Sequence, residues 1–167
     1  MNDPFVAVYD EYFDDIYRFV LYKTGNRWDT DDLVSDIFRK AFQHYRNQQV
    51  DEGRVKPWLF TIARNTVIDH YRKKKEWVYG HDPEVLGYTQ ISGLLDTIDL
   101  QHDCLKQSLL ALAPDEREMI NLKYIAGMKY SEISQVIGKA ELWLKTKVQR
   151  IRQKMALSIN KCMEVLK

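Results

Sequence analysis

A segment that combines helical spacing, a glycine turn and many cations lies at residues 130–155, YSEISQVIGKAELWLKTKVQRIRQKM. Ser131 is expected to cap its first helix, and Ser134 is small enough for a second helix to cross closely. Gly138 stands where the turn between two helices requires left-handed backbone. The apolar residues after the turn recur at intervals of three and four: Leu144, Val148 and Ile151. This spacing predicts a helix-turn-helix.

The outward faces of the second helix carry cations and hydrogen-bonding side chains. They are Lys145, Thr146, Lys147, Gln149, Arg150 and Arg152. Such side chains contact base edges in the major groove through hydrogen bonds and phosphates through charge. A solvated basic surface helix is the alternative interpretation. Because a generic basic helix needs neither Gly138 nor Ser134, the pattern favours a helix that reads DNA.

A second mixed segment, KPWLFTIARNTVIDHYRKKK at residues 56–75, follows a polar loop at residues 47–56. It contains aromatic, amide and cationic residues: Trp58, Phe60, Thr61, Arg64, Asn65, His70, Tyr71 and Arg72. Aromatic rings stack on exposed bases and cations follow phosphates, so this mixture suits separated nucleic-acid strands. Trp58 taken alone is more often a core residue. The four cations that end the segment would have no role in a buried helix.

The charges of this 167-residue chain are segregated, although the formal net charge is only +1. Residues 54–75 hold seven basic groups and one acidic group, and residues 139–154 hold six basic groups and one acidic group. Between them, residues 76–105 hold six acidic groups and no Lys or Arg. The two basic segments predict contact with a polyanion at two places.

The element pattern predicts an all-α fold, because seven Gly and four Pro are the main interruptions and no segment alternates with a period of two. A first helix is expected to end at Gly25 and Asn26. Asp29 is expected to cap a second helix, and Pro57 to be the first residue of a third. Pro114 is expected to start a later helix, which leads into the helix-turn-helix.

The predicted helices divide into two small domains. Residues 1–75 form the first domain, and residues 96–167 form the second, which contains the helix-turn-helix. Residues 76–95 combine glycine, proline and acidic residues, so we expect a flexible acidic linker there. Each domain is large enough to bury only a modest core.

The two cysteines, Cys104 and Cys162, are too few for a disulfide framework and lack the spacing of paired metal ligands. We expect both to be unpaired, buried residues in a reducing cytoplasm. The N-terminus lacks a charged-then-apolar signal, and no apolar run is long enough to span a bilayer. The expectation is a soluble cytoplasmic protein without direct membrane insertion.

No residue cluster indicates an enzyme. His102, Asp103 and Cys104 are neighbours on a helix and point in different directions, so they cannot form a nucleophilic relay. No His or Cys pair has metal-ligand spacing, and no glycine-rich phosphate loop is present. We therefore expect no catalytic residues, no metal and no cofactor.

Three sequence stretches resemble a known family. DTDDLVSDIFRKAFQHY and KPWLFTIARNTVIDHYRKKK are similar to region 2 of the extracytoplasmic-function sigma factors, a group of bacterial sigma-70 relatives. The stretch LLALAPDEREMINLKYIAGMKYSEISQVIGKAELWLKTKVQRIRQKM is similar to their region 4. The resemblance covers nearly the whole chain outside the linker, in the same order and spacing. It implies a subunit that directs RNA polymerase to promoters by opening the minus-10 element and reading the minus-35 element.

The resemblance implies three functional surfaces. A polymerase-binding surface, which grips the clamp coiled coil of the largest subunit, corresponds to Asp32, Leu33, Asp36, Phe38 and Arg39. A minus-10 surface, where the family flips a base into a loop, corresponds to Asn47, Lys56, Trp58, Asn65, Arg72 and Lys73. A minus-35 surface corresponds to Lys145, Thr146, Lys147, Gln149 and Arg150. The family also implies an anti-sigma factor that occludes these surfaces.

Three residues depart from the family pattern. Ser35 stands where the family usually has Gln, so one polar contact to polymerase is expected to be lost or replaced. Leu142 and Trp143 stand where small residues usually begin the recognition helix. Large apolar groups there pack against the preceding helix, touch thymine methyl groups or meet a protein partner, and the sequence leaves these three options open.

Two other functions are compatible with part of the pattern. A stand-alone helix-turn-helix repressor or activator would bind a palindromic duplex tightly without polymerase. An RNA-binding or antitermination protein would use the aromatic and basic segment at residues 56–75. The second alternative leaves the C-terminal duplex reader unexplained.

Overall fold

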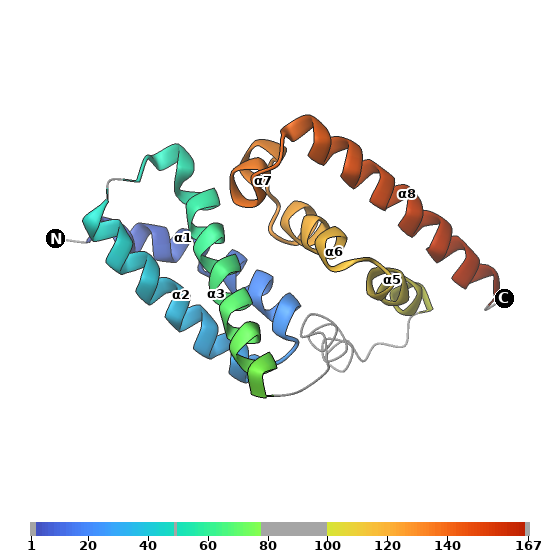
Figure 1. The fold of residues 1–167 in the computed structure, drawn as a ribbon, viewed down its shortest axis with the longest axis horizontal. Helices are drawn as coiled ribbons and strands as arrows, with labels where there is room; N and C mark the ends of the chain where they lie inside the picture. Colours follow the sequence, from blue (N-terminus) through green and yellow to red (C-terminus); the bar gives the residue numbers. More distant parts are fainter. Residues whose placement is uncertain (1–2, 49, 78–99, 166–167) are drawn as a thin grey trace.

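The computed structural model describes residues 3–48, 50–77 and 100–165, and these residues form helices without any strand. The first group of helices comprises α1 (Pro4–Thr24), α2 (Arg27–Asn47), the short 3-10 helix η1 (Glu52–Arg54) and α3 (Val55–Trp77). The second comprises α5 (Leu100–Leu110), α6 (Pro114–Ile120), the π-helical turn η2 (Asn121–Ile125), α7 (Tyr130–Ile137) and α8 (Glu141–Val165). The prediction of an all-α fold with two helical domains is confirmed. Figure 1 shows the two groups beside each other.

Each helical group has its own set of fully buried apolar residues. In the first group, α1, α2 and α3 contribute Ile16, Phe19, Val20, Ile37, Leu59 and Phe60. In the second group, the buried residues are Leu122, Met128, Ile133, Leu144, Val148 and Ile151. Leu144, Val148 and Ile151 are the three residues whose spacing predicted the inner face of the second helix of the helix-turn-helix, and that prediction is confirmed.

Glycine and proline mark several helix ends, as the sequence predicted. Gly25 ends α1 with a φ of 70°, and its N–H donates to the carbonyl of Leu21. Gly138 ends α7 with a φ of 76°. Residues with a Cβ rarely adopt these left-handed angles, so glycine is the expected residue at both positions. Pro114 is the first residue of α6, where its missing N–H leaves no hydrogen bond unmade.

Three predicted helix starts are wrong. The residue that caps α2 is Asn26, whose amide oxygen accepts the N–H of Asp29 at 2.8 Å, so Asp29 lies inside the helix. Ser131 is also a helical residue, because the residue before α7 is Lys129, whose N–H donates to the carboxylate of Glu132 at 2.8 Å. Pro57 is the third residue of α3 and still lies in the first turn, where proline is tolerated.

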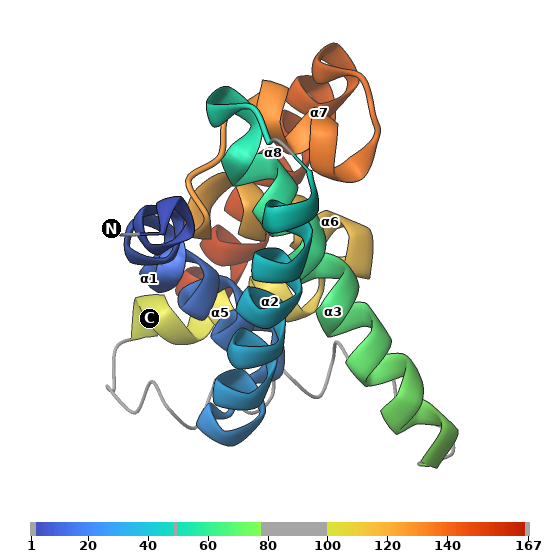
Figure 2. The ribbon, with the colours of Figure 1, turned by 90° about the vertical axis from the view of Figure 1, so that its left-hand side faces the viewer.

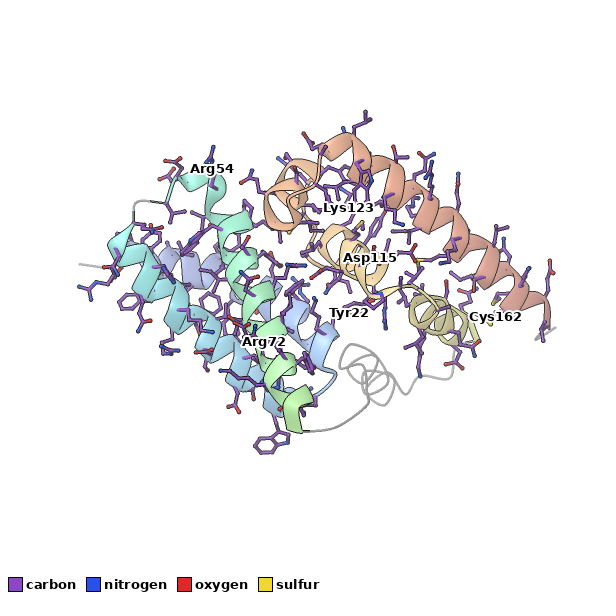
Figure 3. The ribbon with its side chains drawn as sticks, in the orientation of Figure 1. Tyr22, Arg54, Arg72, Asp115, Lys123 and Cys162 are labelled. Carbon is purple, nitrogen blue, oxygen red and sulfur yellow. A yellow bond between two sulfur atoms is a disulfide. The ribbon has the colours of Figure 1, made fainter. Side chains whose placement is uncertain are left out.

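The expectation of two unpaired cysteines is also wrong, because Cys104 in α5 and Cys162 in α8 form a disulfide with a Cα–Cα distance of 5.7 Å. Because the two positions are 58 apart in the sequence, no local pattern indicated this pairing. Figure 3 shows Cys162 near the end of α8. Most of the predicted linker, residues 78–95, lies outside the described residues.

The two helical groups pack against each other. Helix α3 contacts α7, and α1 contacts η2. Figures 1 and 2 show α7 beside the first turns of α3. In the described parts of the chain, no helix has both the length and the hydropathy needed to cross a membrane.

Candidate nucleic-acid interface

Helix α8 separates a packing face from a polar face. Leu144, Val148 and Ile151 are buried, whereas Thr146 and Gln149 are exposed. At 100° of rotation per residue, Thr146 and Gln149 lie on the side of the helix opposite the buried stripe. Two exposed cations, Lys145 and Arg150, flank this polar stripe. The side chains that the sequence assigned to DNA reading therefore share one solvent-facing side of α8, apart from Lys147.

The turn before α8 is closed by hydrogen bonds. The N–H of Gly138 donates to the carbonyl of Ser134 at 2.8 Å, and the Ser134 hydroxyl donates to the carbonyl of Lys139 at 2.6 Å. The small size of Ser134 predicted a close helix crossing, and the structure adds this second bond across the turn. The orientation of α8 relative to α7 is therefore held by backbone groups as well as by packing.

Lys147 differs from its neighbours because it faces a carboxylate. Its ammonium lies 3.5 Å from Glu116 of α6, and the ammonium of Lys154 lies 3.2 Å from the same side chain. Partial burial would raise the pKa of Glu116, but the N–H of Ala113 and the two lysines hold that pKa below its ordinary value. Glu116 thus links the start of α6 to α8. The sequence pattern placed Lys147 in the DNA-reading set and did not identify this contact.

One face of α3 carries three of the six residues assigned to unpaired DNA. Trp58, Asn65 and Arg72 follow one another at intervals of seven residues. Each is therefore rotated by only about 20° around the helix axis from the one before it. Asn65, Arg72 and Lys73 are exposed, and Trp58 is half-buried. The Trp58 ring lies 6.2 Å from the ring of Tyr45 in α2. Arg72, labelled in Figure 3, lies 3.4 Å from Asp69 on the same helix.

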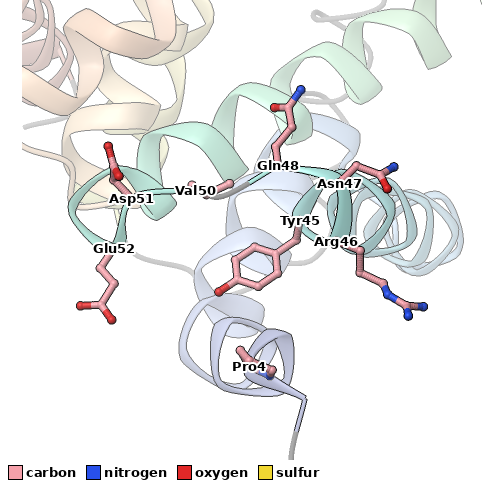
Figure 4. Close-up of a pocket in the computed structure, with 8 residues that line it drawn as sticks. All are labelled: Pro4, Tyr45, Arg46, Asn47, Gln48, Val50, Asp51 and Glu52. Carbon is pink, nitrogen blue, oxygen red and sulfur yellow. The ribbon is translucent and has the colours of Figure 1, made fainter.

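The segment that connects α2 with α3 borders two cavities. The first, of ≈ 470 Å³, is lined by Pro4, Tyr45, Arg46, Asn47, Gln48, Val50, Asp51 and Glu52. In Figure 4, Tyr45 points toward Pro4 of α1, whereas Asn47 and Gln48 extend away from it. The second cavity, of ≈ 270 Å³, is lined by Gln48, Val50, Asp51, Arg54, Pro57, Trp58, Thr61 and Gln135. Asn47 and Trp58 therefore line different cavities along the same connection, whereas Lys56 is half-buried and lines neither.

The residues of α2 that were assigned to polymerase binding differ in burial and form two sets. Leu33 and Phe38 are buried, and the Phe38 ring packs against the rings of α1. Asp32 and Arg39 are exposed and Asp36 is half-buried; their spacing of four and three residues puts them on one face. Partial burial opposes ionisation of Asp36, but hydrogen bonds from Lys40 and Arg39 hold its pKa below the ordinary value. The outer face of α2 therefore presents a fixed carboxylate with cations around it.

A buried ion cluster joins the two helical groups. Glu118 of α6 accepts from the Lys23 ammonium at 2.8 Å and lies 2.9 Å from Nε of Arg64 in α3. Burial would raise the pKa of Glu118, but Lys23 and Arg64 hold it below its ordinary value. Gln135 of α7 also crosses the boundary, since it lines the cavity beside Trp58. Sequence reasoning missed Lys23, Glu118 and Gln135, because their partners are distant along the chain.

The described side chains give no indication of a metal centre. In the parts of the chain that the structure describes, no three His, Cys, Asp or Glu side chains are arranged to hold a metal ion. The exposed faces of α3 and α8 carry cations, amides and hydroxyls, which suit phosphates and base edges.

Two family models match the chain. The model described as Sigma-70 region 2 matches residues 8–76, and the model described as Sigma-70, region 4 matches residues 102–155. Among curated relatives, the ECF RNA polymerase sigma factor SigM of Bacillus subtilis is 30% identical over 156 residues, which cover 92% of this chain and 94% of SigM. SigW of the same organism is 30% identical over 164 residues, which cover 91% of this chain and 87% of SigW.

Two solved structures have the same fold. The sigma factor RpoE from Bartonella quintana, in complex with the anti-sigma factor NepR, has a TM-score of 0.68 and 23% identity, with 93% of this chain and 96% of that chain covered. CnrH, in complex with the cytosolic domain of CnrY, has a TM-score of 0.66 and 22% identity, with 94% and 88% covered. At these identities the similarity concerns the fold.

Proposed function

Because this chain belongs to the extracytoplasmic-function group of sigma-70 factors, which serve transcription initiation, we propose that it directs RNA polymerase core to promoters with two separate elements. In this proposal, α3 and the connection before it capture the opened minus-10 strand. Helix α8 reads the minus-35 duplex in the major groove. Sigma factors are DNA-binding regulatory proteins rather than enzymes, so the chemistry of RNA synthesis belongs to the polymerase.

The observation that carries the proposal is the pair of different polar faces on α3 and α8. Unpaired bases are recognised by stacking and amide contacts, which Trp58 and Asn65 offer, while Arg72 and Lys73 follow the phosphates. A flipped base would enter a cavity beside the connection between Asn47 and Lys56. Duplex DNA is read by hydrogen bonds and charge in the major groove. Lys145, Thr146, Gln149 and Arg150 offer these contacts, and Lys147 contributes charge next to Glu116.

The exposed face of α2 is the proposed contact with the polymerase core. Asp32, Asp36 and Arg39 would bind the clamp coiled coil of the largest subunit by charge-assisted hydrogen bonds. Leu33 and Phe38, which are buried, would hold the backbone of α2 in place for this contact. Such a contact makes the binding of both DNA elements effectively intramolecular, so weak individual contacts combine into useful promoter affinity.

The proposed domain division follows these roles. Residues 1–75 bind the polymerase core and the minus-10 element, residues 76–95 form the linker, and residues 96–167 bind the minus-35 element. The linker would set the tolerated spacing between the two promoter elements. A protein that works with RNA polymerase acts in the cytoplasm, which is the proposed location.

An anti-sigma factor is a proposed further partner. RpoE and CnrH, which have the same fold, were each solved in a complex, and NepR is described as an anti-sigma factor. A partner of this kind would cover the face of α2 or the DNA-reading faces. The stand-alone repressor or activator remains the second candidate, because its helix-turn-helix would have the same geometry.

Run-off transcription from a genomic fragment library, with purified bacterial core polymerase, tests the proposal. Adding the chain should produce new transcripts whose start sites share two upstream elements. Asn65→Ala and Arg150→Ala should change which start sites appear, whereas Lys161→Ala, at an exposed position near the end of α8, should not. The absence of new transcripts, together with unaided binding to a palindromic duplex, would favour the stand-alone regulator.

A further inference from the structure

Two large apolar side chains are exposed at the start of α8. Leu142 is 77% exposed and Trp143 is 44% exposed, directly after the turn that leads into the helix. Neither side chain packs into the core; the first buried residue of α8 is Leu144. A single exposed leucine is common on protein surfaces. Here the position matters, because the first turn of a recognition helix is the part that meets base edges in the major groove.

The helical period places Leu142 on the DNA-reading stripe. Leu142, Thr146 and Gln149 are separated by four and three residues, so they form one row opposite the buried stripe. The Thr146 hydroxyl donates to the carbonyl of Leu142 at 3.0 Å. The Thr146 hydroxyl proton is therefore already donated within the helix. The Leu142 side chain is the apolar end of the row.

The charges around these side chains favour DNA over an apolar protein surface. The Lys139 ammonium lies 5.8 Å from the centre of the Trp143 ring. Lys145 and Arg150 are exposed on either side of the stripe. A protein partner with an apolar surface would have to desolvate these cations without pairing them. A duplex supplies phosphates for the cations and an apolar group for the leucine.

The only large apolar group on base edges in the major groove is the thymine 5-methyl group. We propose that Leu142 is a specificity-determining residue that contacts a thymine methyl group in the duplex read by α8, with Trp143 extending the same apolar surface. This inference rests on the proposed function of α8 and adds a base preference to it. The contact removes one methyl group and part of a leucine side chain from water.

The expected effect follows from the size of one methyl group. Burial of one such group corresponds to a change of roughly fourfold in binding. Replacing thymine by uracil removes the methyl group and leaves the hydrogen-bonding edge unchanged. A thymine-to-uracil substitution at the contacted position should therefore weaken wild-type binding roughly fourfold and leave Leu142→Ala unaffected.

The experiment uses the full chain with core polymerase. A promoter library with a randomised upstream duplex is transcribed, and the templates that produce transcripts are sequenced. Wild-type protein should select a thymine at one position. Leu142→Ala should lose that preference and keep the base preferences at the other positions. The selected promoter is then synthesised with deoxyuridine at that position, and open-complex formation is compared for the two proteins.

Leu157→Ala is the matched control. Leu157 is 66% exposed on the same side of α8 but lies near the other end of the helix. This variant should therefore keep the thymine preference, and deoxyuridine should weaken its binding roughly fourfold, as for the wild type. If wild-type protein directs specific transcription but deoxyuridine has the same effect on wild type and Leu142→Ala, the methyl contact is wrong and the proposed function stands. If wild-type protein yields no specific transcripts, the proposed function fails, and this inference fails with it.

Discussion

At the scale of single residues, Lys147 and Arg150 lie one turn apart on α8 but have different surroundings. Lys147 is half-buried and lies 3.5 Å from Glu116. Arg150 is exposed on the flank of the proposed DNA-reading stripe. A cation that already has a carboxylate partner neutralises less phosphate charge than a cation that faces solvent. The two residues should therefore affect DNA binding to different degrees.

Arg150→Ala is expected to reduce the slope of log K against log salt concentration by about 1, because one phosphate or base contact is lost. Lys147→Ala should change that slope less, and it should reduce the free energy of unfolding by no more than about 1 kcal/mol through loss of its pair with Glu116. Fluorescence anisotropy of labelled promoter duplex with the polymerase-bound chain, over a salt series, measures the slopes. Equal slopes for the two variants would contradict the different roles.

At the scale of elements, the turn between α7 and α8 depends on a backbone conformation that favours glycine. Gly138 has a φ of 76°, and apart from the glycine and its two neighbours in the chain, no atom lies within 4 Å of the place that a Cβ would take. An added methyl group would therefore meet no neighbour, and the cost of Gly138→Ala would be backbone strain alone.

Gly138→Ala is expected to lower the free energy of unfolding by roughly 1–2 kcal/mol. Gly53→Ala is the matched control, since Gly53 also has open space around it and is not among the glycines with positive φ. Chemical denaturation followed by circular dichroism measures both variants. If both had the same stability as the wild type, backbone strain at the turn would be ruled out as a constraint.

The disulfide between α5 and α8 is a second constraint at this scale. It closes a loop across 58 residues of separation, so it should stabilise the second domain by up to about 4 kcal/mol. Thermal unfolding with and without reductant should show a lower midpoint for the reduced wild type. Cys104→Ala/Cys162→Ala should melt at one temperature in both conditions. A wild-type protein that releases two free thiols in denaturant without reductant would argue against the bond.

Local chemistry determined how much of the fold was predictable from sequence. The ends of α1 and α7 were predictable, because Gly25 and Gly138 take backbone angles that other residues avoid. The exposed row on α8 was predictable from the helical period. The Cys104–Cys162 disulfide was not, because it depends on how α5 packs against α8. The Lys23–Glu118 pair likewise joins residues 95 apart, and no local pattern reports such a contact.

At the scale of the whole molecule, the two helical groups meet through charges as well as apolar residues. The Glu118 carboxylate lies between Lys23 of α1 and Arg64 of α3. Helix α3 carries the proposed minus-10 surface, and Gln135 of α7 lines the cavity beside it. An opened DNA strand would need this space. Binding of both promoter elements is therefore expected to require some separation of α7 from α3.

Glu118→Gln is expected to favour separated domains. Without the carboxylate, Lys23 and Arg64 lose their shared counter-charge at the interface, which costs on the order of 3 kcal/mol. Small-angle X-ray scattering should therefore show a larger radius of gyration for Glu118→Gln than for wild type. Asp115→Asn, which changes an exposed carboxylate on the same helix (Figure 3), should scatter like the wild type. Identical curves for all three proteins would contradict the role of the ion cluster.

The same carboxylate predicts how the contact between the domains depends on pH. The pKa of Glu118 lies below its ordinary value of 4.5 in the packed form, so packing is favoured by the ionised group. The contribution of Glu118 to the packing of the two domains is fully present above pH 4.5 and is lost as the pH falls through the lowered pKa. The radius of gyration of the wild type should therefore stay constant from neutral pH down to about 5 and rise only at more acidic pH. Glu118→Gln should lack this transition, and circular dichroism at each pH would separate domain opening from loss of helix. A wild-type transition near neutral pH, where Glu118 stays ionised, would show that another group controls the contact.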